Sequence, residues 1–241
     1  RVVHTEGKES VMLRGVDNNK DQTYFLCQLN QKQLNNSLFP IGELTKPEVR
    51  QIAEELNLPV AHKKDSTGIC FIGERDFREF LKNYIPAKSG KMVDIVSKKV
   101  IGEHQGIMYY TIGQRKGLGI GGNGEPWFVV GKDYDKNILY IAQGDSNKWL
   151  LSHGALITDV NWVSETKPEG EYDCTAKFRY RQKDNDVSLH FIDDTTLYVT
   201  FKKPIKAVTP GQAAVFYDGD VCLGGGTIDK VYKDGKEIDY L

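Results

Sequence analysis

The sequence lacks long apolar segments and clusters of metal-binding residues. No apolar run approaches the roughly 20 residues that a membrane helix needs, and the first residues contain no apolar signal core. The four cysteines lie far apart without a C-x-x-C pair, and the five histidines lack the spacing of metal ligands. These absences argue against a membrane protein, a secreted disulfide framework and a structural zinc site. We therefore expect a cytoplasmic protein.

The sequence also lacks a strong net charge, internal repeats and low-complexity tracts. Lysine and arginine total 32 and aspartate and glutamate total 33, which gives a formal net charge of -1. This balance does not exclude nucleic acid as a partner, because a local basic face can bind phosphate while the remaining surface stays acidic. With 241 residues, the chain could form one large domain or two to three small ones.

Helix signals concentrate in the first third of the chain. Thr45 and Glu48 match a capping box, Pro47 suits the first turn, and an amphipathic pattern follows to about Asn57. A second helix is predicted over residues 74–86, and a shorter one over residues 21–29. We expect this part of the chain to be helical.

Beyond Pro86 the apolar period changes to two. Residues 91–102 and 127–142 are typical of strand pairs, and from Leu150 onward the chain consists of short predicted strands. Spacings of roughly 8 to 12 residues indicate a small barrel or sandwich. Asp218-Gly219 is a hairpin turn signal.

A glycine-rich stretch, residues 117–122, matches the G-x-G-x-x-G pattern of dinucleotide-binding proteins. The sequence after it predicts a turn and a strand, whereas the fingerprint requires a helix. We interpret the stretch as a flexible loop. Arg115 and Lys116, beside Tyr109 and Tyr110, suit RNA or an ordinary solvated turn equally well.

Two further polar stretches suggest nucleic-acid contacts. In A-K-F-R-Y-R-Q-K the cations recur at every second residue, so one extended strand would present all four on one face. That face could bind RNA or could be an exposed barrel surface. In N-K-D-Q, residues 19–22, the side chains could bind base edges or cap a helix. The four cations are Lys177, Arg179, Arg181 and Lys183.

One cysteine differs from the others in its surroundings. Cys27, Cys174 and Cys222 fit small buried hydrophobes. Cys70 follows K-K-D-S-T-G, where two lysines favour a thiolate and the glycine permits close backbone approach. The residues alone leave open whether Cys70 is core packing or a reactive thiol. A cysteine hydrolase would need a base beside it, such as His62 or His104.

Six stretches, spread over residues 13–225, form a distinctive set of motifs. They are G-V-D-N-N-K-D-Q-T-Y-F-L, L-F-P-I-G-E-L-T-K-P-E-V-R, K-K-D-S-T-G-I-C-F-I-G-E-R-D-F-R-E-F-L, G-E-H-Q-G-I-M-Y-Y-T-I-G-Q-R-K-G-L-G-I-G, T-P-G-Q-A-A-V-F-Y and C-L-G-G-G. Together they resemble the bacterial tRNA-specific 2-thiouridylase family. The resemblance implies replacement of the 2-oxygen of the wobble uridine of tRNA by sulfur. It makes Cys70 the carrier of a persulfide.

The resemblance also implies the partners and the RNA contacts. ATP, with magnesium, activates the uridine oxygen, and a sulfur-relay protein fed by a cysteine desulfurase charges the cysteine. We expect a monomer. The tRNA contacts implied by the family fall on Lys20, Asp21, Gln22, Arg179, Tyr180 and Gln212.

The sequence departs from the family pattern by lacking the S-G-G-V-D-S-S motif and the Asp-x-x-Cys of the second catalytic cysteine. We therefore expect an inactive C-terminal part of the enzyme, without an ATP site. The expected fold is α+β and multidomain: a helical tail of an α/β nucleotide-binding catalytic (PP-loop) domain over residues 1–75, a central domain over 76–148 and a β-barrel over 149–241. The alternative is a noncatalytic RNA-binding module in which Cys70 only packs.

Overall fold

The computed structural model describes residues 1–64, 80–81 and 83–240 and combines a few short helices with many strands. The chain forms two compact units. One consists of Arg1–His62 with Ser152–Glu237, and the other of Lys63–Leu151 with Ile238–Leu241. Among the described residues, no helix has both the length and the apolar character needed to cross a membrane.

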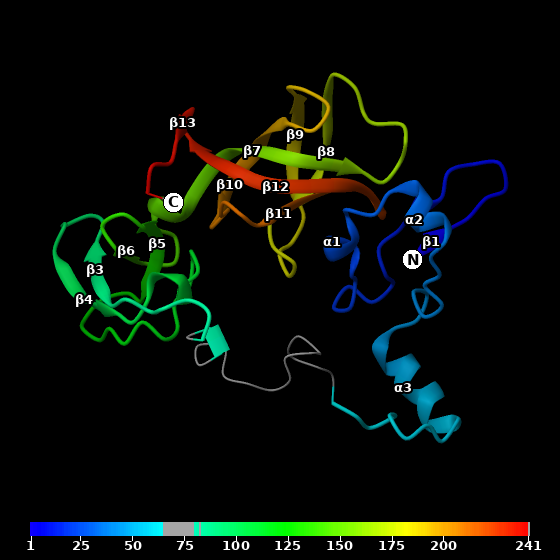
Figure 1. The fold of residues 1–241 in the computed structure, drawn as a ribbon, viewed down its shortest axis with the longest axis horizontal. Helices are drawn as coiled ribbons and strands as arrows, with labels where there is room; N and C mark the ends of the chain where they lie inside the picture. Colours follow the sequence, from blue (N-terminus) through cyan, green and yellow to red (C-terminus); the bar gives the residue numbers. More distant parts are fainter. Residues whose placement is uncertain (65–79, 82, 241) are drawn as a thin grey trace. The chain divides into compact units, whose positions relative to one another are not determined.

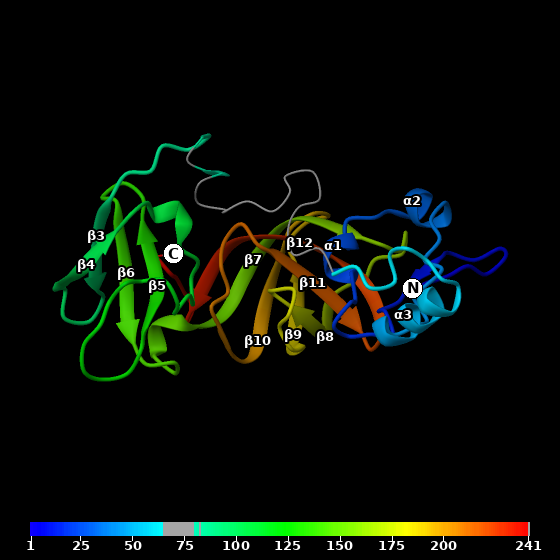
Figure 2. The ribbon, with the colours of Figure 1, turned by 90° about the horizontal axis from the view of Figure 1, so that it is seen from below.

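Six strands close into a β-barrel, as expected for the last third of the chain (Figure 1, Figure 2). Their order is β11-β8-β9-β10-β7-β12, and β12 pairs again with β11 to close the ring, while β13 adds to β12. The strands are β7 (Leu151–Trp162), β8 (Glu171–Lys177), β9 (Asn185–Phe191), β10 (Leu197–Lys206), β11 (Ala213–Asp218), β12 (Val221–Lys233) and β13 (Lys236–Glu237).

The predicted hairpin near Asp218 joins β11 to β12. Asp218 pairs with Val221, which leaves Gly219 and Asp220 as the two-residue turn. Gly219 has a φ of 54°, a conformation that glycine adopts without steric cost. The turn signal was therefore correct, with the turn itself one residue further along.

Strand β11 is buried on both of its faces. Successive side chains of a strand point to opposite faces, yet Ala214, Val215, Phe216 and Tyr217 are all 0% exposed. Val215 and Tyr217 belong to a core cluster with residues of the N-terminal segment and of β12. That cluster also contains Met12, Tyr24, Cys27, Leu34, Val163 and Cys222. The N-terminal segment thus packs on the outside of the barrel as part of the same unit.

The N-terminal segment contains two short strands and three helices: β1 (Val2–Val3), β2 (Val11–Met12), α1 (Thr23–Leu26), α2 (Gln31–Asn35) and α3 (Lys46–Glu55). The predicted start of α3 is confirmed, because the Glu48 carboxylate accepts the backbone N–H of Thr45 at 2.7 Å. The predicted helix over residues 21–29 is reduced to the four residues of α1. Most of the helix predicted over 74–86 lies outside the described residues.

The second unit contains a four-stranded sheet of order β4-β3-β6-β5. Its strands are β3 (Gly90–Asp94), β4 (Val100–His104), β5 (Trp127–Asp133) and β6 (Ile138–Gln143), and only the β3–β6 pair is parallel. The strand pairs expected over 91–102 and 127–142 are confirmed. A strand, β5, follows the glycine-rich loop, as the sequence pattern indicated.

His104 is buried at the end of β4 and has an ordinary structural environment. Its Nε2 lies 3.1 Å from the carbonyl oxygen of Asn137, and its Nδ1 accepts the backbone N–H of Gly106 at 3.2 Å. Burial lowers the pKa of this imidazole below its usual value. Because Nδ1 already accepts a hydrogen bond and Nε2 faces a carbonyl oxygen, neither ring nitrogen is free to act as a cysteine's general base.

Candidate nucleic-acid interface

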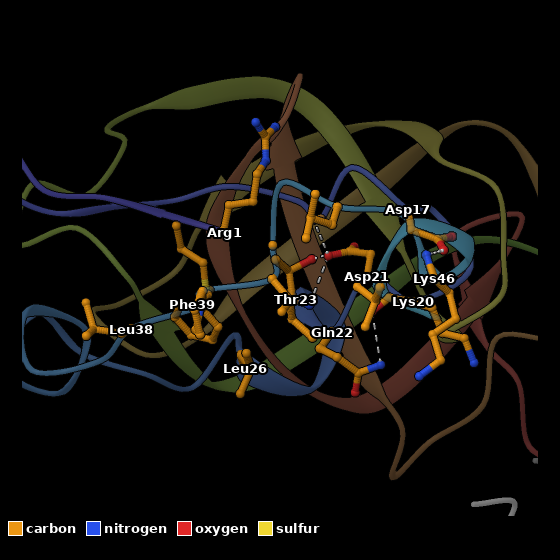
Figure 3. Close-up of a pocket in the computed structure, with 17 residues that line it drawn as sticks. Arg1, Asp17, Lys20, Asp21, Gln22, Thr23, Leu26, Leu38, Phe39 and Lys46 are labelled. Atoms are coloured by element: carbon orange, nitrogen blue, oxygen red, sulfur yellow. Dashed lines mark hydrogen bonds between the residues drawn. The ribbon is translucent and has the colours of Figure 1, made fainter. Parts of the chain in front are cut away.

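The loop before α1 carries three of the predicted RNA-contact residues. Asp21 is 5% exposed, and its carboxylate accepts the backbone N–H of Gly15 at 3.0 Å and the hydroxyl of Thr23 at 2.7 Å (Figure 3). It also accepts the backbone N–H of Thr23 at 3.2 Å. Lys20 and Gln22, on either side, are exposed. Asp21 therefore fixes the loop from the inside, while its two neighbours face outward.

A second aspartate connects this loop to α3. Asp17 accepts the backbone N–H groups of Lys46 and Asn19, each at 2.9 Å. These backbone hydrogen bonds, that from Lys46 first, lower the pKa of the Asp17 carboxyl group below its usual value. The loop is therefore attached at both ends, which gives Lys20 and Gln22 defined positions.

Gln22 reaches across to the loop between β8 and β9. Its Nε2 donates a hydrogen bond to the Tyr180 hydroxyl at 2.9 Å, although the two residues are 158 positions apart in the sequence. The N-K-D-Q stretch and the basic stretch around Arg179 and Tyr180 thus meet in one place. Arg179 and Gln212 line the same cavity as Tyr180, so four of the predicted contact residues lie together.

The prediction of a single basic face on an extended strand was wrong. Strand β8 ends at Lys177, and the chain then turns, with the backbone N–H of Gln182 donating to the carbonyl of Arg179 at 3.0 Å. The Gln182 side chain accepts the backbone N–H of Phe178 at 2.9 Å, which stabilises the turn. Of the four cations, Arg179 lines one cavity, which Arg181 also borders, whereas Lys177, Arg181 and Lys183 line a second cavity.

The first of these cavities, here named the aromatic pocket, has a volume of about 920 Å³. Tyr24, Phe25 and Tyr180 line it together with Arg179 and Gln212. Burial lowers the pKa of the Arg179 guanidinium group, which donates to the Thr209 hydroxyl at 3.3 Å. The Oε1 atom of Gln212 is buried and has no hydrogen-bond partner within the described part of the chain. The pocket therefore combines aromatic rings with buried polar groups.

The second cavity, here named the basic pocket, has a volume of about 890 Å³ and is lined by five cationic side chains and one carboxylate. Asp184 supplies the carboxylate, and both terminal nitrogens of Arg14 donate to its Oδ1 atom at 3.1 Å. The Arg14 guanidinium also lies 3.7 Å from the centre of the Tyr217 ring. The excess of positive charge suits a phosphate group. The five cations are Arg14, Lys20, Lys177, Arg181 and Lys183.

A third cavity, of about 440 Å³, lies beside the Lys20–Gln22 loop (Figure 3). Most of its remaining wall is apolar and includes Leu38, which is 82% exposed, and Ile41, which is 60% exposed. Lys20 lines both this cavity and the basic pocket. The loop thus separates an apolar surface from a cationic one.

The described cysteines fit the packing role predicted for them. Cys27 and Cys222 are buried and Cys174 is partly buried, and all three are free thiols. Burial raises the pKa of Cys27 to about 11 and that of Cys174 to about 12, and it also raises the pKa of Cys222. None of the three is therefore an activated thiolate. Cys70, the predicted persulfide carrier, lies outside the described residues.

Two residues of this surface were missed from the sequence. Phe25 was only one residue of the helix predicted over residues 21–29, but the structure leaves it 59% exposed in the aromatic pocket. Arg14 gave no signal of its own, because its partner Asp184 is 170 positions away. A local signal for Phe25 existed in the run Tyr24-Phe25 directly after the polar N-K-D-Q stretch.

Three family models match consecutive parts of the chain. The tRNA methyl transferase HUP domain matches residues 1–74, the tRNA methyl transferase PRC-barrel domain residues 78–143, and the aminomethyltransferase beta-barrel domain residues 152–228. The third match coincides with most of the observed barrel. The descriptions refer to methyl transfer, whereas the curated relatives carry a different name.

Those relatives are called tRNA-specific 2-thiouridylase MnmA. The protein of Bacillus cytotoxicus is 59% identical over all 241 residues, and those of Bacillus cereus (strain ATCC 14579) and Bacillus thuringiensis (strain Al Hakam) are 58% identical over the same length. The chain spans 64% of the length of each of these relatives. Over its whole length, the chain is thus similar to the tRNA-specific 2-thiouridylases.

Proposed function

We propose that the chain is part of a tRNA 2-thiouridylase that replaces the 2-oxygen of a wobble uridine by sulfur in an ATP-dependent reaction. Support comes from the 58–59% identity to relatives named tRNA-specific 2-thiouridylase. The single structural observation that carries the proposal is the hydrogen bond between Gln22 and Tyr180. It joins two segments that the family resemblance assigns independently to tRNA binding.

The sulfur is proposed to travel on Cys70 as a persulfide. Two lysines begin the K-K-D-S-T-G-I-C stretch, and their positive charge favours the thiolate form of Cys70. The thiolate is the form that accepts sulfur from a relay protein that a cysteine desulfurase charges. ATP, with magnesium, is proposed to activate the uridine oxygen as a leaving group. No residue of this chain is assigned to ATP or to the second catalytic cysteine.

The tRNA is proposed to bind across the two pockets that meet at Tyr180. Lys20 supplies positive charge, and Gln22, Arg179, Tyr180 and Gln212 supply hydrogen-bonding or stacking groups. Asp21 is proposed to act through the loop, because its carboxylate accepts three internal hydrogen bonds. An enzyme acting on a base must take that base out of its stack, which makes backbone and stacking contacts the expected source of affinity.

The test of the catalytic proposal uses the whole enzyme. After incubation with a cysteine desulfurase, its relay protein and cysteine, mass spectrometry of the peptide containing Cys70 should show one added sulfur. Cys70→Ser should abolish thiolation of a tRNA transcript, while Cys174→Ser serves as the matched control and should retain activity. Thiolation by Cys70→Ser at the wild-type rate would reject the carrier role.

The rival function is an RNA-binding module without catalysis. The same surface supports it, since nothing in the two pockets requires Cys70 to react. The two proposals differ in one result: a module would bind tRNA and leave Cys70 without added sulfur. A cysteine hydrolase is disfavoured by His104, both of whose ring nitrogens are already engaged.

A further inference from the structure

Phe25 is an exposed aromatic side chain on the short helix α1, whose other residues are buried or partly buried. Its neighbours Thr23, Tyr24 and Cys27 are 3%, 8% and 2% exposed, whereas Phe25 is 59% exposed. A single exposed apolar residue is unremarkable by itself. Phe25, however, is part of a ring cluster: its centre lies 4.6 Å from that of Tyr180 and 5.4 Å from that of Tyr24.

The helix that carries Phe25 is fixed to the barrel by side-chain hydrogen bonds. The Tyr24 hydroxyl donates to the carbonyl of Ala213 at 2.9 Å, and the Gln28 side chain donates to that of Gly225 at 3.1 Å. Asn161 of β7 donates to the carbonyl of Cys27 at 2.9 Å. Phe25 is thus held on a firm support, which lowers the entropy lost when a ligand stacks on its ring.

The cavity beside the ring has the features of a site for a planar polar ring. Phe25, Tyr24 and Tyr180 supply π-faces, and Gln212 supplies a buried carboxamide oxygen without a hydrogen-bond partner in the described chain. A nucleobase presents just such a combination, with an apolar face and N–H donors along its edge. A buried acceptor left unsatisfied is costly, so an arriving N–H group would be favoured.

The basic pocket lies directly across Tyr180 and Arg181, which line both cavities. A base in the aromatic pocket therefore has a cationic pocket next to it for its phosphate. Arg181 and Lys183 are exposed and make no ion pair within the described part of the chain, so they are available to an anion. A free planar metabolite would not require this second pocket, whereas a nucleic-acid strand does.

We propose that Phe25, together with Tyr180, forms a stacking platform for one unpaired base of the bound RNA, with the base edge directed at Gln212. This inference rests on the proposed binding of tRNA and adds a residue and a type of contact to it. The base is a single-stranded one, because a base inside a duplex has no free face to offer. Stacking of a base on Phe25 requires no reaction at Cys70.

The test measures the affinity of the 241-residue chain for a tRNA transcript over a series of KCl concentrations. Phe25→Ala should weaken binding roughly 5- to 100-fold, the range found when a stacking ring is removed. The salt dependence should stay unchanged, because no charge is lost. Phe25→Trp should restore affinity, and Ile192→Ala, at another exposed apolar residue of the same unit, should have no effect.

A second probe separates stacking from general binding. A blunt RNA duplex without unpaired bases should bind wild type and Phe25→Ala equally. Arg181→Ala should weaken binding to both RNAs and reduce the salt slope by about 1. The stacking platform would be rejected if Phe25→Ala weakened binding to the duplex as much as binding to tRNA. It would also be rejected if Phe25→Ala bound tRNA within twofold of wild type while Arg181→Ala bound it more weakly. Either result would leave the proposed RNA binding intact. Failure of the wild-type chain to bind either RNA would overturn the platform together with the proposed RNA surface.

Discussion

The aromatic and basic pockets have nearly equal volumes, about 920 and 890 Å³, yet they are built from different kinds of residue. The aromatic pocket contains rings, a carboxamide, the half-buried Arg179 and, at its border with the basic pocket, Arg181, and internal hydrogen bonds hold its walls. The basic pocket is lined largely by lysines and arginines around a single carboxylate. Contacts in the first depend on shape and burial, whereas contacts in the second depend on charge and therefore on salt. Affinity and salt dependence should accordingly respond to mutations in different pockets.

The largest effect on tRNA binding is expected at Tyr180, which lines both pockets. Tyr180→Ala removes a stacking ring and the acceptor of the Gln22 hydrogen bond, and it should weaken tRNA binding by about 3 kcal/mol. Tyr180→Phe keeps the ring and loses only the hydrogen bond, so about 1 kcal/mol is expected. Filter binding at fixed salt measures both. Equal losses for the two variants would show that the hydroxyl, and not the ring, carries the contact.

A comparable effect on stability should appear at alkaline pH, and two residues that line the aromatic pocket, Cys27 and Tyr24, should contribute to it. Folding raises the pKa of Cys27 from 9.0 to about 11 and that of Tyr24 from 10.0 to about 12. Because the folded pKa values are raised, their stabilising contribution is complete below pH 9 and is lost as the pH rises toward 11 and 12. Cys27 alone should account for about 2 kcal/mol of this loss.

Urea denaturation of the chain between pH 7 and 11 measures that loss. Cys27→Ala lowers stability at every pH through the cavity it leaves, but it should flatten the decline between pH 9 and 11. Cys70→Ala is the control for cysteine chemistry in general. An unchanged pH dependence in Cys27→Ala would mean that the Cys27 thiol does not contribute to the alkaline loss.

Neutralising Asp184, the carboxylate among the described residues of the basic pocket, should strengthen tRNA binding, whereas Tyr180→Ala should weaken it. Asp184→Asn keeps an oxygen that Arg14 can use, but it removes the negative charge that balances the cations. Folding stability should fall by about 1 kcal/mol, because Asp184 is partly exposed and its pairing with Arg14 is partly screened. Binding of tRNA should become tighter by a few fold, with a steeper salt slope. Weaker binding would indicate that Asp184 itself contacts the RNA.

Features that depend on neighbouring residues could be predicted from the sequence, whereas a turn set by a side-chain hydrogen bond could not. The start of α3 was predictable because Thr45, Pro47 and Glu48 interact within one turn. The barrel strands were predictable from their period of two. The end of β8 was missed because the K-F-R-Y-R stretch keeps the period of two. The chain turns there because the Gln182 side chain accepts the backbone N–H of Phe178, four residues before it.

The meeting of Gln22 with Tyr180, and of Arg14 with Asp184, has no local signature in the sequence. The members of each pair are 158 and 170 positions apart, and they approach only because the N-terminal segment packs on β11 and β12. The family resemblance could assign Lys20, Gln22, Arg179, Tyr180 and Gln212 to RNA binding. It could not indicate that Tyr180 divides an aromatic cavity from a basic one.

The smallest expected effect belongs to Lys183, an exposed cation at the rim of the basic pocket. Lys183→Ala should weaken tRNA binding by about 0.5 kcal/mol at moderate salt and reduce the salt slope by about 1, because one phosphate contact is lost. Folding stability should not change, since Lys183 forms no ion pair among the described residues. The matched control is Lys203, an exposed lysine of β10 that lines neither pocket. Lys203→Ala should leave the slope unaltered, and an equal change in both variants would mean that the RNA senses the overall charge of the barrel and not the basic pocket.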